Sequence, residues 1–224
     1  MVIRLLPLIA GIAPFAGITL AFVIGVSYDA LPSCIPYIDG CTSISSTGRR
    51  MPGSLLFRAV MFPQAAILAF LWYFSVRWLV ALSPTDKPTS LILGFGLVGA
   101  LALILYVTFL GTKQPFYELM RRYGIYLYFL GTIVGQLALA IAVFKLARKK
   151  AMRSLQRYGA VLLWFCVLPF ALGILNMILK AVLENSDRAE NVIEWNVALI
   201  MQGYFIVLYR AWRSTGFSAD VRVS

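Results

Sequence analysis

Residues 89–110 read TSLILGFGLVGALALILYVTFL, a run without a single Asp, Glu, Lys or Arg. A helix needs about 20 apolar residues to cross the hydrocarbon core of a bilayer, which is about 30 Å thick. Five other stretches of the chain have a similar length and apolar character. The sequence therefore predicts six transmembrane helices, over residues 7–26, 55–80, 89–110, 123–146, 158–179 and 192–212.

The composition of the whole chain agrees with this reading. Of its 224 residues, 61% are apolar and 13% are charged, with a mean hydropathy of +0.84. A soluble domain is nearer 45–50% apolar and about 25% charged. A soluble enzyme, a secreted disulfide scaffold and a disordered chain are excluded. We predict an all-α polytopic membrane protein, with one six-helix domain over residues 1–224.

The chain contains no histidine. Ser-His-Asp triads, Cys-His pairs and His-ligated zinc sites are therefore excluded. A G-x-S-x-G elbow, a phosphate-binding glycine loop after a strand and a paired-Asp magnesium motif are also missing from the sequence. The sequence leaves enzymatic activity open but offers no motif for it, and we expect no catalytic residue, metal or cofactor.

The distribution of basic residues predicts the orientation in the membrane. The net charge of +11 falls mostly between the apolar blocks, which favours contact with anionic headgroups over binding of nucleic acid. Lys and Arg mark the cytoplasmic side of a membrane protein. Twelve of the 20 Lys and Arg residues lie in the N-terminus, the second and fourth loops and the tail. They include Lys87, Arg222 and the six basic residues from Lys145 to Arg157. Both termini are therefore predicted to be cytoplasmic.

The first outer loop, residues 31–51, is the longest polar stretch and holds Cys34 and Cys41. An oxidising compartment would allow a bridge between these two cysteines, and two free thiols are the alternative. Cys166 lies within the fifth span, where it is expected to pack as a small apolar residue.

Polar residues within the spans are the candidate site, because ionisable groups at membrane depth are costly and usually face a cavity or a partner. Arg58, Lys180 and Glu194 lie near the outer ends of their spans, so they are expected to form one cluster beneath the first outer loop. In the functional interpretation this cluster binds a lipid headgroup; in the structural one it is a salt bridge, or its side chains extend to water. The other candidates are Gln64, Gln136, Asn176, Asn196 and Gln202.

Small and aromatic residues suggest how the helices pack. Gly94, Gly96 and Gly99 lie in the third span, and Gly131 and Gly135 lie one turn apart in the fourth. Such residues let helix backbones approach closely, and packing within the bundle is favoured over a homodimer seam. Four tryptophans near span ends are expected to anchor the chain at the membrane interface: Trp72, Trp78, Trp195 and Trp212.

Two short motifs point to a known family. Residues 34–58 read CIPYIDGCTSISSTGRRMPGSLLFR, and residues 192–198 read VIEWNVA. Both resemble the Frag/DRAM/Sfk family of six-span membrane proteins. The first stretch shares with the family a Pro-aromatic-Ile element, an Ile-Ser pair, a Gly, a Pro and a Phe. The second shares a Glu-aromatic pair that opens the last helix. Where many members carry a histidine entering the fourth helix, this chain has Arg121-Arg122-Tyr123. The positions carried over by the resemblance are Ser45, Gly48, Pro52, Phe57, Glu194 and Trp195.

The resemblance implies work on membrane lipids, because the family includes post-GPI-attachment lipid-remodelling factors, the N-terminal part of yeast Cwh, DRAM proteins and Sfk-type regulators. Our leading hypothesis is an accessory or carrier in lipid or GPI-anchor-like remodelling. Its headgroup site at the outer leaflet would use Arg58, Lys180, Glu194, Gln64, Asn176 and Ser45. Gly48, Pro52, Phe57 and Trp195 would shape the loop.

Two other functions stay open. The first is a non-catalytic scaffold that recruits a protein partner or anionic lipid through the basic residues 145–157. The second is a small-molecule transporter using Gln136, Asn176 and Lys180. The expected location is the inner membrane in a bacterium, or the ER or Golgi membrane in a eukaryote. The sequence gives no indication of oligomeric state or of which lipid is handled.

Overall fold

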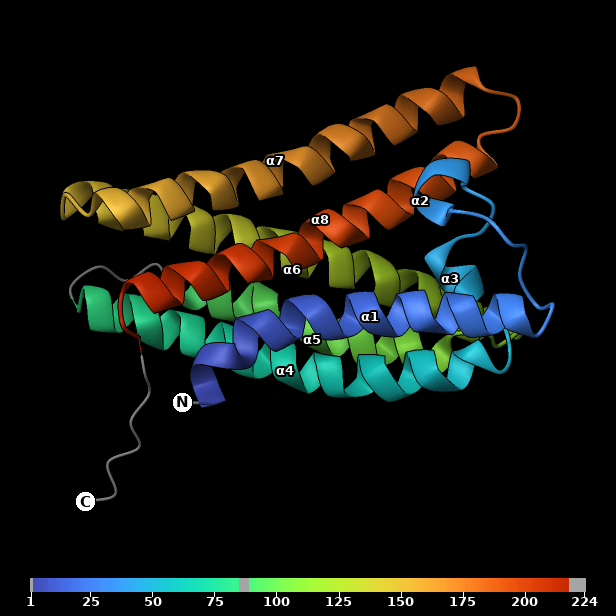
Figure 1. The fold of residues 1–224 in the computed structure, drawn as a ribbon, viewed down its shortest axis with the longest axis horizontal. Helices are drawn as coiled ribbons and strands as arrows, with labels where there is room; N and C mark the ends of the chain where they lie inside the picture. Colours follow the sequence, from blue (N-terminus) through green and yellow to red (C-terminus); the bar gives the residue numbers. More distant parts are fainter. Residues whose placement is uncertain (1, 85–88, 218–224) are drawn as a thin grey trace.

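A computed structural model of the chain describes residues 2–84 and 89–217, and these residues form a bundle of long helices (Figure 1). Lys87 and Arg222, which counted toward the predicted orientation, lie outside them. The short elements are η1 (Val2–Leu5), α2 (Pro36–Asp39) and α3 (Ile44–Thr47). The long helices are α1 (Leu6–Ser27), α4 (Gly53–Leu82), α5 (Thr89–Phe109), α6 (Pro115–Lys149), α7 (Arg153–Val182) and α8 (Asp187–Ser214).

The prediction of six membrane-spanning helices is confirmed, since six helices are long and apolar enough to cross a bilayer. Several extend beyond the predicted spans: α6 has 35 residues, and α4 and α7 have 30 each. About 20 residues suffice to cross the hydrocarbon core, so these helices are longer than a perpendicular crossing requires. Hydropathy measures only the apolar part of each helix.

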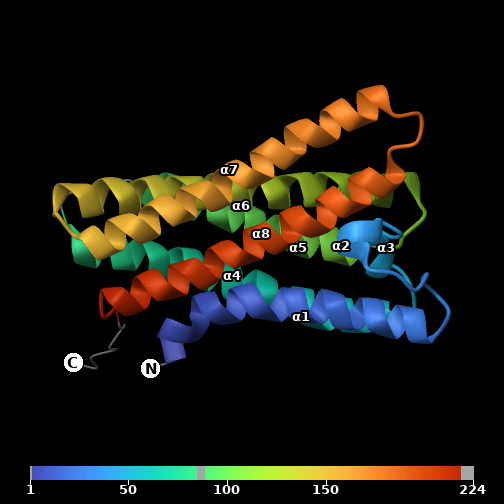
Figure 2. The ribbon, with the colours of Figure 1, turned by 45° about the horizontal axis from the view of Figure 1, so that its top comes forward.

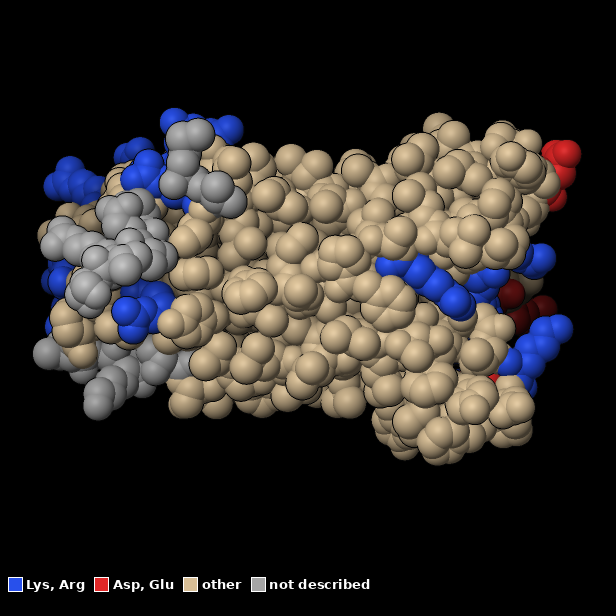
Figure 3. Space-filling model, turned by 90° about the horizontal axis from the view of Figure 1, so that it is seen from below, with Lys and Arg blue, Asp and Glu red and all other residues tan. Residues whose placement is uncertain are grey.

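The two ends of the bundle differ in composition. Helix α1 begins and α8 ends at the same end of the bundle (Figure 1), where Arg4 Nε donates a 2.7 Å hydrogen bond to the carbonyl oxygen of Phe217. We call this the terminal end, and the opposite end, which carries α2 and α3, the loop end. On the face seen in Figure 3, acidic side chains gather at the loop end, and a broad belt without charged side chains separates the two ends. That belt has the character of a surface in contact with hydrocarbon.

Glycines bring α5 and α6 into close backbone contact. A methyl group added at Gly131 would lie 2.7 Å from the backbone nitrogen of Gly99 and 2.7 Å from the carbonyl oxygen of Phe95. At Gly124 it would lie 2.7 Å from the nitrogen of Tyr106. The predicted role of small residues in packing within the bundle is therefore confirmed for Gly96, Gly99, Gly131 and Gly135, and it is wrong for Gly94, where an added methyl group meets nothing within 4 Å.

The four tryptophans that the sequence suggested as interface anchors are buried instead, and that prediction is wrong. The rings of Trp72 and Phe205 lie 6.1 Å apart, as do those of Trp78 and Trp212, while Trp195 lies under the first loop. Position along a span fixes the depth of a side chain but not its direction around the helix axis. The tryptophan on the surface is Trp164, which is 65% exposed.

Helix α7 separates from the bundle as it approaches the loop end (Figures 1 and 2). Its buried residues are Leu155, Gly159, Leu162, Cys166 and Pro169, and residues 170–182 contribute none. Pro169 has no backbone N–H and so interrupts the hydrogen-bond ladder of the helix where the separation begins. The half of α7 at the loop end thus leaves a space beside α6 and α8.

Candidate functional site

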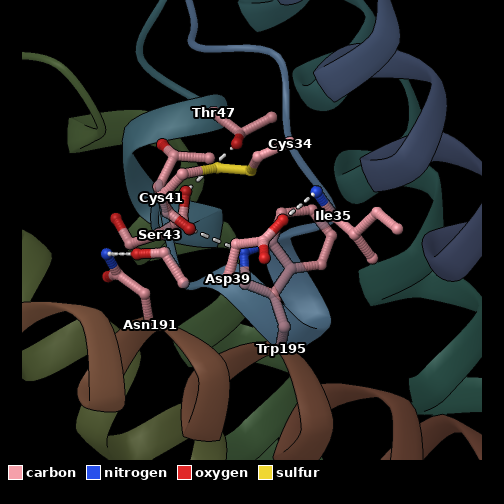
Figure 4. The surroundings of a disulfide bond; sticks show 10 residues. Cys34, Ile35, Asp39, Cys41, Ser43, Thr47, Asn191 and Trp195 are labelled. Carbon is pink, nitrogen blue, oxygen red and sulfur yellow. Dashed lines mark hydrogen bonds between the residues drawn. A yellow bond between two sulfur atoms is a disulfide. The ribbon is translucent and has the colours of Figure 1, made fainter.

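The first loop, residues 28–52, is closed by a disulfide. Cys34 and Cys41 are bonded, with their Cα atoms 6.5 Å apart, which confirms the predicted bridge (Figure 4). Asp39 Oδ2 accepts a 2.7 Å hydrogen bond from the backbone N–H of Ile35 within the same turn. Gly40 ends α2 in the left-handed conformation, with φ at +61°, which glycine adopts without steric cost.

Side chains of α8 hold this loop against the bundle. Trp195 Nε1 donates a 2.8 Å hydrogen bond to the carbonyl oxygen of Thr42, and Asn191 Nδ2 donates one of 2.8 Å to that of Gly40. Asn196 Nδ2 donates to the carbonyl oxygen of Tyr37 at 3.0 Å. The rings of Tyr37 and Trp195 meet edge to face at 5.0 Å, and burial raises the pKa of the Tyr37 hydroxyl above its ordinary value. Asn191 was missed by sequence reasoning, although it lies one turn before Trp195.

Glu194 contacts the loop at the start of α3. Its Oε1 accepts a 3.3 Å hydrogen bond from the backbone N–H of Ser45. Ser43 caps the same helix by accepting a 3.0 Å hydrogen bond from the N–H of Ser46. The amides in the first turn of a helix lack partners within it, so Glu194 and Ser43 together satisfy two of them. Glu194 thereby ties α8 to the loop.

The expected cluster of Arg58, Lys180 and Glu194 does not form, and this expectation is corrected. Arg58 Nη2 donates a 2.6 Å hydrogen bond to the carbonyl oxygen of Leu110. Lys180 Nζ pairs with Glu190 Oε2 at 2.7 Å. Arg58, Lys180 and Glu194 therefore each have a different partner. Hydropathy gives no information on which group a charged side chain contacts.

The other candidates have varied environments. Gln64 Nε2 donates a 2.8 Å hydrogen bond to the carbonyl oxygen of Ala10, and Gln136 Nε2 donates one of 3.0 Å to that of Met201, so both amides link helices in the core. Gly48 packs closely against Phe57 and Leu110, and Pro52 directly precedes the first residue of α4.

A cavity of about 700 Å³ opens at the loop end, between α6, α7 and α8 and beside α3. Of the sequence candidates, Glu194, Ser45 and Asn176 line it. Its charged side chains are Arg49, Arg121, Arg122, Glu190 and Glu194. Its apolar lining includes Ile125, Phe129, Ile133, Pro169 and Val197. The cavity therefore joins a charged region to an apolar one.

The arginines of the cavity are the part of the site that sequence reasoning did not assign. Arg49 Nε donates a 3.1 Å hydrogen bond to the carbonyl oxygen of Ser45. Arg121 and Arg122 have no hydrogen-bond or ion-pair partner among the described residues. The only signal in the sequence was a pair of arginines near the start of a membrane span. Guanidinium groups in such a cavity are suited to phosphate, which they can bind through two parallel hydrogen bonds.

A smaller cavity of about 50 Å³ lies next to the large one and shares Tyr106, Ile125, Phe129 and Glu194 with it. Its remaining lining is mostly apolar and includes Phe57 and Met61 of α4. Glu194 therefore borders both spaces. The carboxylate lies at the boundary between the polar cavity and the apolar core.

These features define a polytopic membrane protein in which a disulfide-bonded loop covers one end of a six-helix bundle. The sequence model of the Frag1/DRAM/Sfk1/Cwh43P N-terminal domain matches residues 2–214, and the chain belongs to this family. The resemblance seen in the two motifs is thereby confirmed. Comparison with curated proteins and with solved structures gave no match.

Proposed function

We propose that this protein binds the headgroup of a phosphate-bearing membrane lipid in the cavity at the loop end. The observation that carries the proposal is that one cavity combines an apolar lining beside α7 with Arg121 and Arg122, which have no hydrogen-bond or ion-pair partner within residues 2–84 and 89–217. A phosphate would take the guanidinium groups, and the acyl chains would take the apolar side.

The position of α7 provides a path for the lipid. The cavity is bordered by Pro169 and Gly173, at the level where α7 leaves the bundle. The nearby surface is apolar: Tyr126 is 69% exposed and Met177 is 72% exposed. A lipid can move sideways from the bilayer into such an opening without taking its chains through water.

The charge distribution supports a site in the outer leaflet. The basic connection between α6 and α7 lies at the terminal end, and the cytoplasmic side of a membrane protein is enriched in Lys and Arg. The loop end would then face the periplasm, the organelle lumen or the cell exterior. A disulfide in the first loop is compatible with an oxidising compartment there.

Within this proposal the protein acts as an accessory or carrier in lipid or glycolipid-anchor remodelling. It would hold a lipid by its headgroup and present it to a separate catalyst. The family resemblance to lipid-remodelling factors supports this more specific role.

An untargeted lipid profile of cells that lack the gene tests the proposal. We expect at least one lipid species to change on deletion, and to return with the wild type but not with the R121Q/R122Q double variant. The matched control is R50Q/K113Q, which removes two exposed charges from the same end without touching the cavity. An unchanged profile, or equal rescue by both double variants at equal membrane levels, would reject the proposal.

A second candidate function is a scaffold, favoured by the basic surface at the terminal end. Six cations around the connection between α6 and α7 are exposed: Lys145, Arg148, Lys149, Lys150, Arg153 and Arg157. Such a surface attracts anionic lipids or an acidic partner. The triple reversal K145E/R153E/R157E would abolish function in this case, while R121Q/R122Q would leave it intact.

Transport is not proposed. Gln136 links α6 to α8, and Lys180 forms an ion pair with Glu190, so two of the three residues expected to handle a transported molecule already have protein partners.

A further inference from the structure

We infer that the cavity selects a lipid whose headgroup carries both a phosphate and a primary ammonium group, as in phosphoethanolamine. This inference rests on the proposed function and narrows its ligand class. The observation behind it is that cations and carboxylates from different elements line the same cavity. Arg121 and Arg122 come from α6 and Arg49 follows α3, whereas Glu190 and Glu194 come from α8.

The two carboxylates of α8 differ in their remaining capacity. Glu190 is engaged on both oxygens, with Oε2 at 2.7 Å from Lys180 Nζ and Oε1 accepting a 2.6 Å hydrogen bond from Ser186. Glu194 Oε1 accepts from the N–H of Ser45 at 3.3 Å. A carboxylate offers about four acceptor positions, and Glu194 also interacts with the backbone N–H of Ile44, so about half of its acceptor capacity is left for a ligand. Lys180 balances the charge of Glu190, whereas no side-chain cation within the described residues pairs directly with Glu194.

A purely anionic headgroup fits this arrangement poorly. Its phosphate would gain from Arg121 and Arg122, but it would bring further negative charge toward Glu194 in a site of reduced dielectric. A zwitterionic headgroup removes this conflict, because its phosphate faces the guanidinium groups while its cation faces Glu194. The charge pattern of the cavity is then complementary to that of the ligand.

The cationic group of the headgroup should carry N–H donors. Glu194, Ser45 and Asn191 all border the cavity and offer acceptor oxygens, since Asn191 uses only its Nδ2 to hold Gly40. A primary ammonium group has three donors, which matches three acceptors. A trimethylammonium group has none and is typically recognised by a cage of aromatic rings. The aromatic side chains of the cavity, Tyr106, Tyr126 and Phe129, come from α5 and α6, whereas Ile193 and Val197, which line it beside Glu194 on α8, are aliphatic.

The apolar part of the cavity indicates that the ligand is the lipid and not free phosphoethanolamine. Ile125, Phe129 and Ile133 extend the lining along α6, beside the part of α7 that stands apart from the bundle. A soluble headgroup would leave these side chains uncovered. An acyl chain buries apolar surface there and adds to the affinity.

The test is native mass spectrometry of the full-length protein in detergent, titrated with three lipids that share the same acyl chains. These are phosphatidylethanolamine, phosphatidylcholine and phosphatidylglycerol. We expect the wild type to bind the ethanolamine lipid about ten-fold more tightly than either of the others, because only this lipid forms a charge-assisted hydrogen bond with Glu194. Equal or tighter binding of the glycerol lipid would overturn the inference. This comparison needs no substitution and so does not depend on the folding of a variant.

Two variants separate this inference from the proposed function. In E194Q the side-chain oxygen can still accept a hydrogen bond from Ser45, but the negative charge is gone. The variant should therefore bind the ethanolamine and choline lipids with about equal affinity. The matched control E184Q, at an exposed acid outside the cavity, should keep it. R121Q/R122Q should weaken binding of all three lipids. If R121Q/R122Q weakens all three but E194Q keeps the wild-type preference, the inference fails and the proposed function stands.

If R121Q/R122Q binds every lipid as the wild type does, the proposed function fails as well. A last arm adds soluble phosphoethanolamine as a competitor. At a concentration equal to that of the lipid, soluble phosphoethanolamine should not displace the bound lipid. Displacement under those conditions would overturn the assignment of a lipid ligand.

Discussion

The indole Nε1 of Trp195 donates a 2.8 Å hydrogen bond to the carbonyl oxygen of Thr42, joining residues 153 positions apart in the chain. This bond fixes the first loop on α8 directly before Ser43 and Ser45, which border the large cavity. The same turn of α8 carries Glu194, which contacts Ser45. One turn of the last helix therefore positions both the loop that covers the cavity and the carboxylate of Glu194.

Replacing Trp195 by Phe removes the donor but keeps an aromatic ring. The buried carbonyl of Thr42 would lose its partner, and leaving a buried polar group unsatisfied costs about 1–3 kcal/mol. We expect W195F to unfold at a lower temperature in detergent than the wild type. W164F is the control, because Trp164 is exposed on the surface of α7. Equal shifts for the two variants would show that the bond to Thr42 contributes nothing to stability.

Gly40 offers a second test of how the loop is held. Its φ of +61° is unfavourable for any residue with a Cβ, and that atom would overlap the backbone carbonyl of Arg188. We expect G40A to detach the loop from α8 and to make residues 28–52 sensitive to protease while the helices stay intact. G94A is the matched control, because a methyl group at Gly94 meets nothing within 4 Å. Protease patterns identical to the wild type in both variants would contradict this role.

The sequence predicted the number and order of the helices well, because hydropathy integrates over about 20 residues and errors at single positions cancel. It could not predict which side of each helix faces the core. Helices that are apolar all round carry no stripe that distinguishes the two sides. For this reason the sequence predicted Trp72 at the membrane interface, whereas in the structure it packs on Phe205. The same limitation applies to Arg58 and Lys180, whose partners, the carbonyl of Leu110 and Glu190, were not predicted.

The site was predictable only in part. Ser45 and Trp195 were found through the family motifs, and Glu194 through both its place in the last span and the motifs. The structure brings all three to the contact between the first loop and α8. Arg121 and Arg122 were noted only as a departure from the family pattern. Their place in the cavity depends on how far α7 stands from α6, a tertiary feature that leaves no periodicity in the sequence.

The orientation can be measured with single cysteines. Cys34 and Cys41 are bridged and Cys166 is buried, so the wild type should not react with a membrane-impermeant maleimide. We expect K113C, at the loop end, to be labelled from the outer face of the membrane in intact cells or sealed vesicles. R148C, at the terminal end, should be labelled only after permeabilisation. Both positions are exposed, so a reversed pattern would place the loop end in the cytoplasm and reject a site in the outer leaflet.

The last prediction compares two glycines in neighbouring helices. Gly131 lies where the backbones of α5 and α6 nearly touch, whereas a methyl group at Gly173 of α7 meets nothing within 4 Å. Overpacking a close contact typically costs about 1–3 kcal/mol, so G131V should lower the unfolding temperature more than G173V, although both add the same side chain. Gly173 borders the large cavity, and a valine there should narrow it. We therefore expect G173V to keep a temperature near that of the wild type while binding less lipid in native mass spectra. Undiminished lipid binding by G173V would show that the space between α6 and α7 is not the path of the acyl chains.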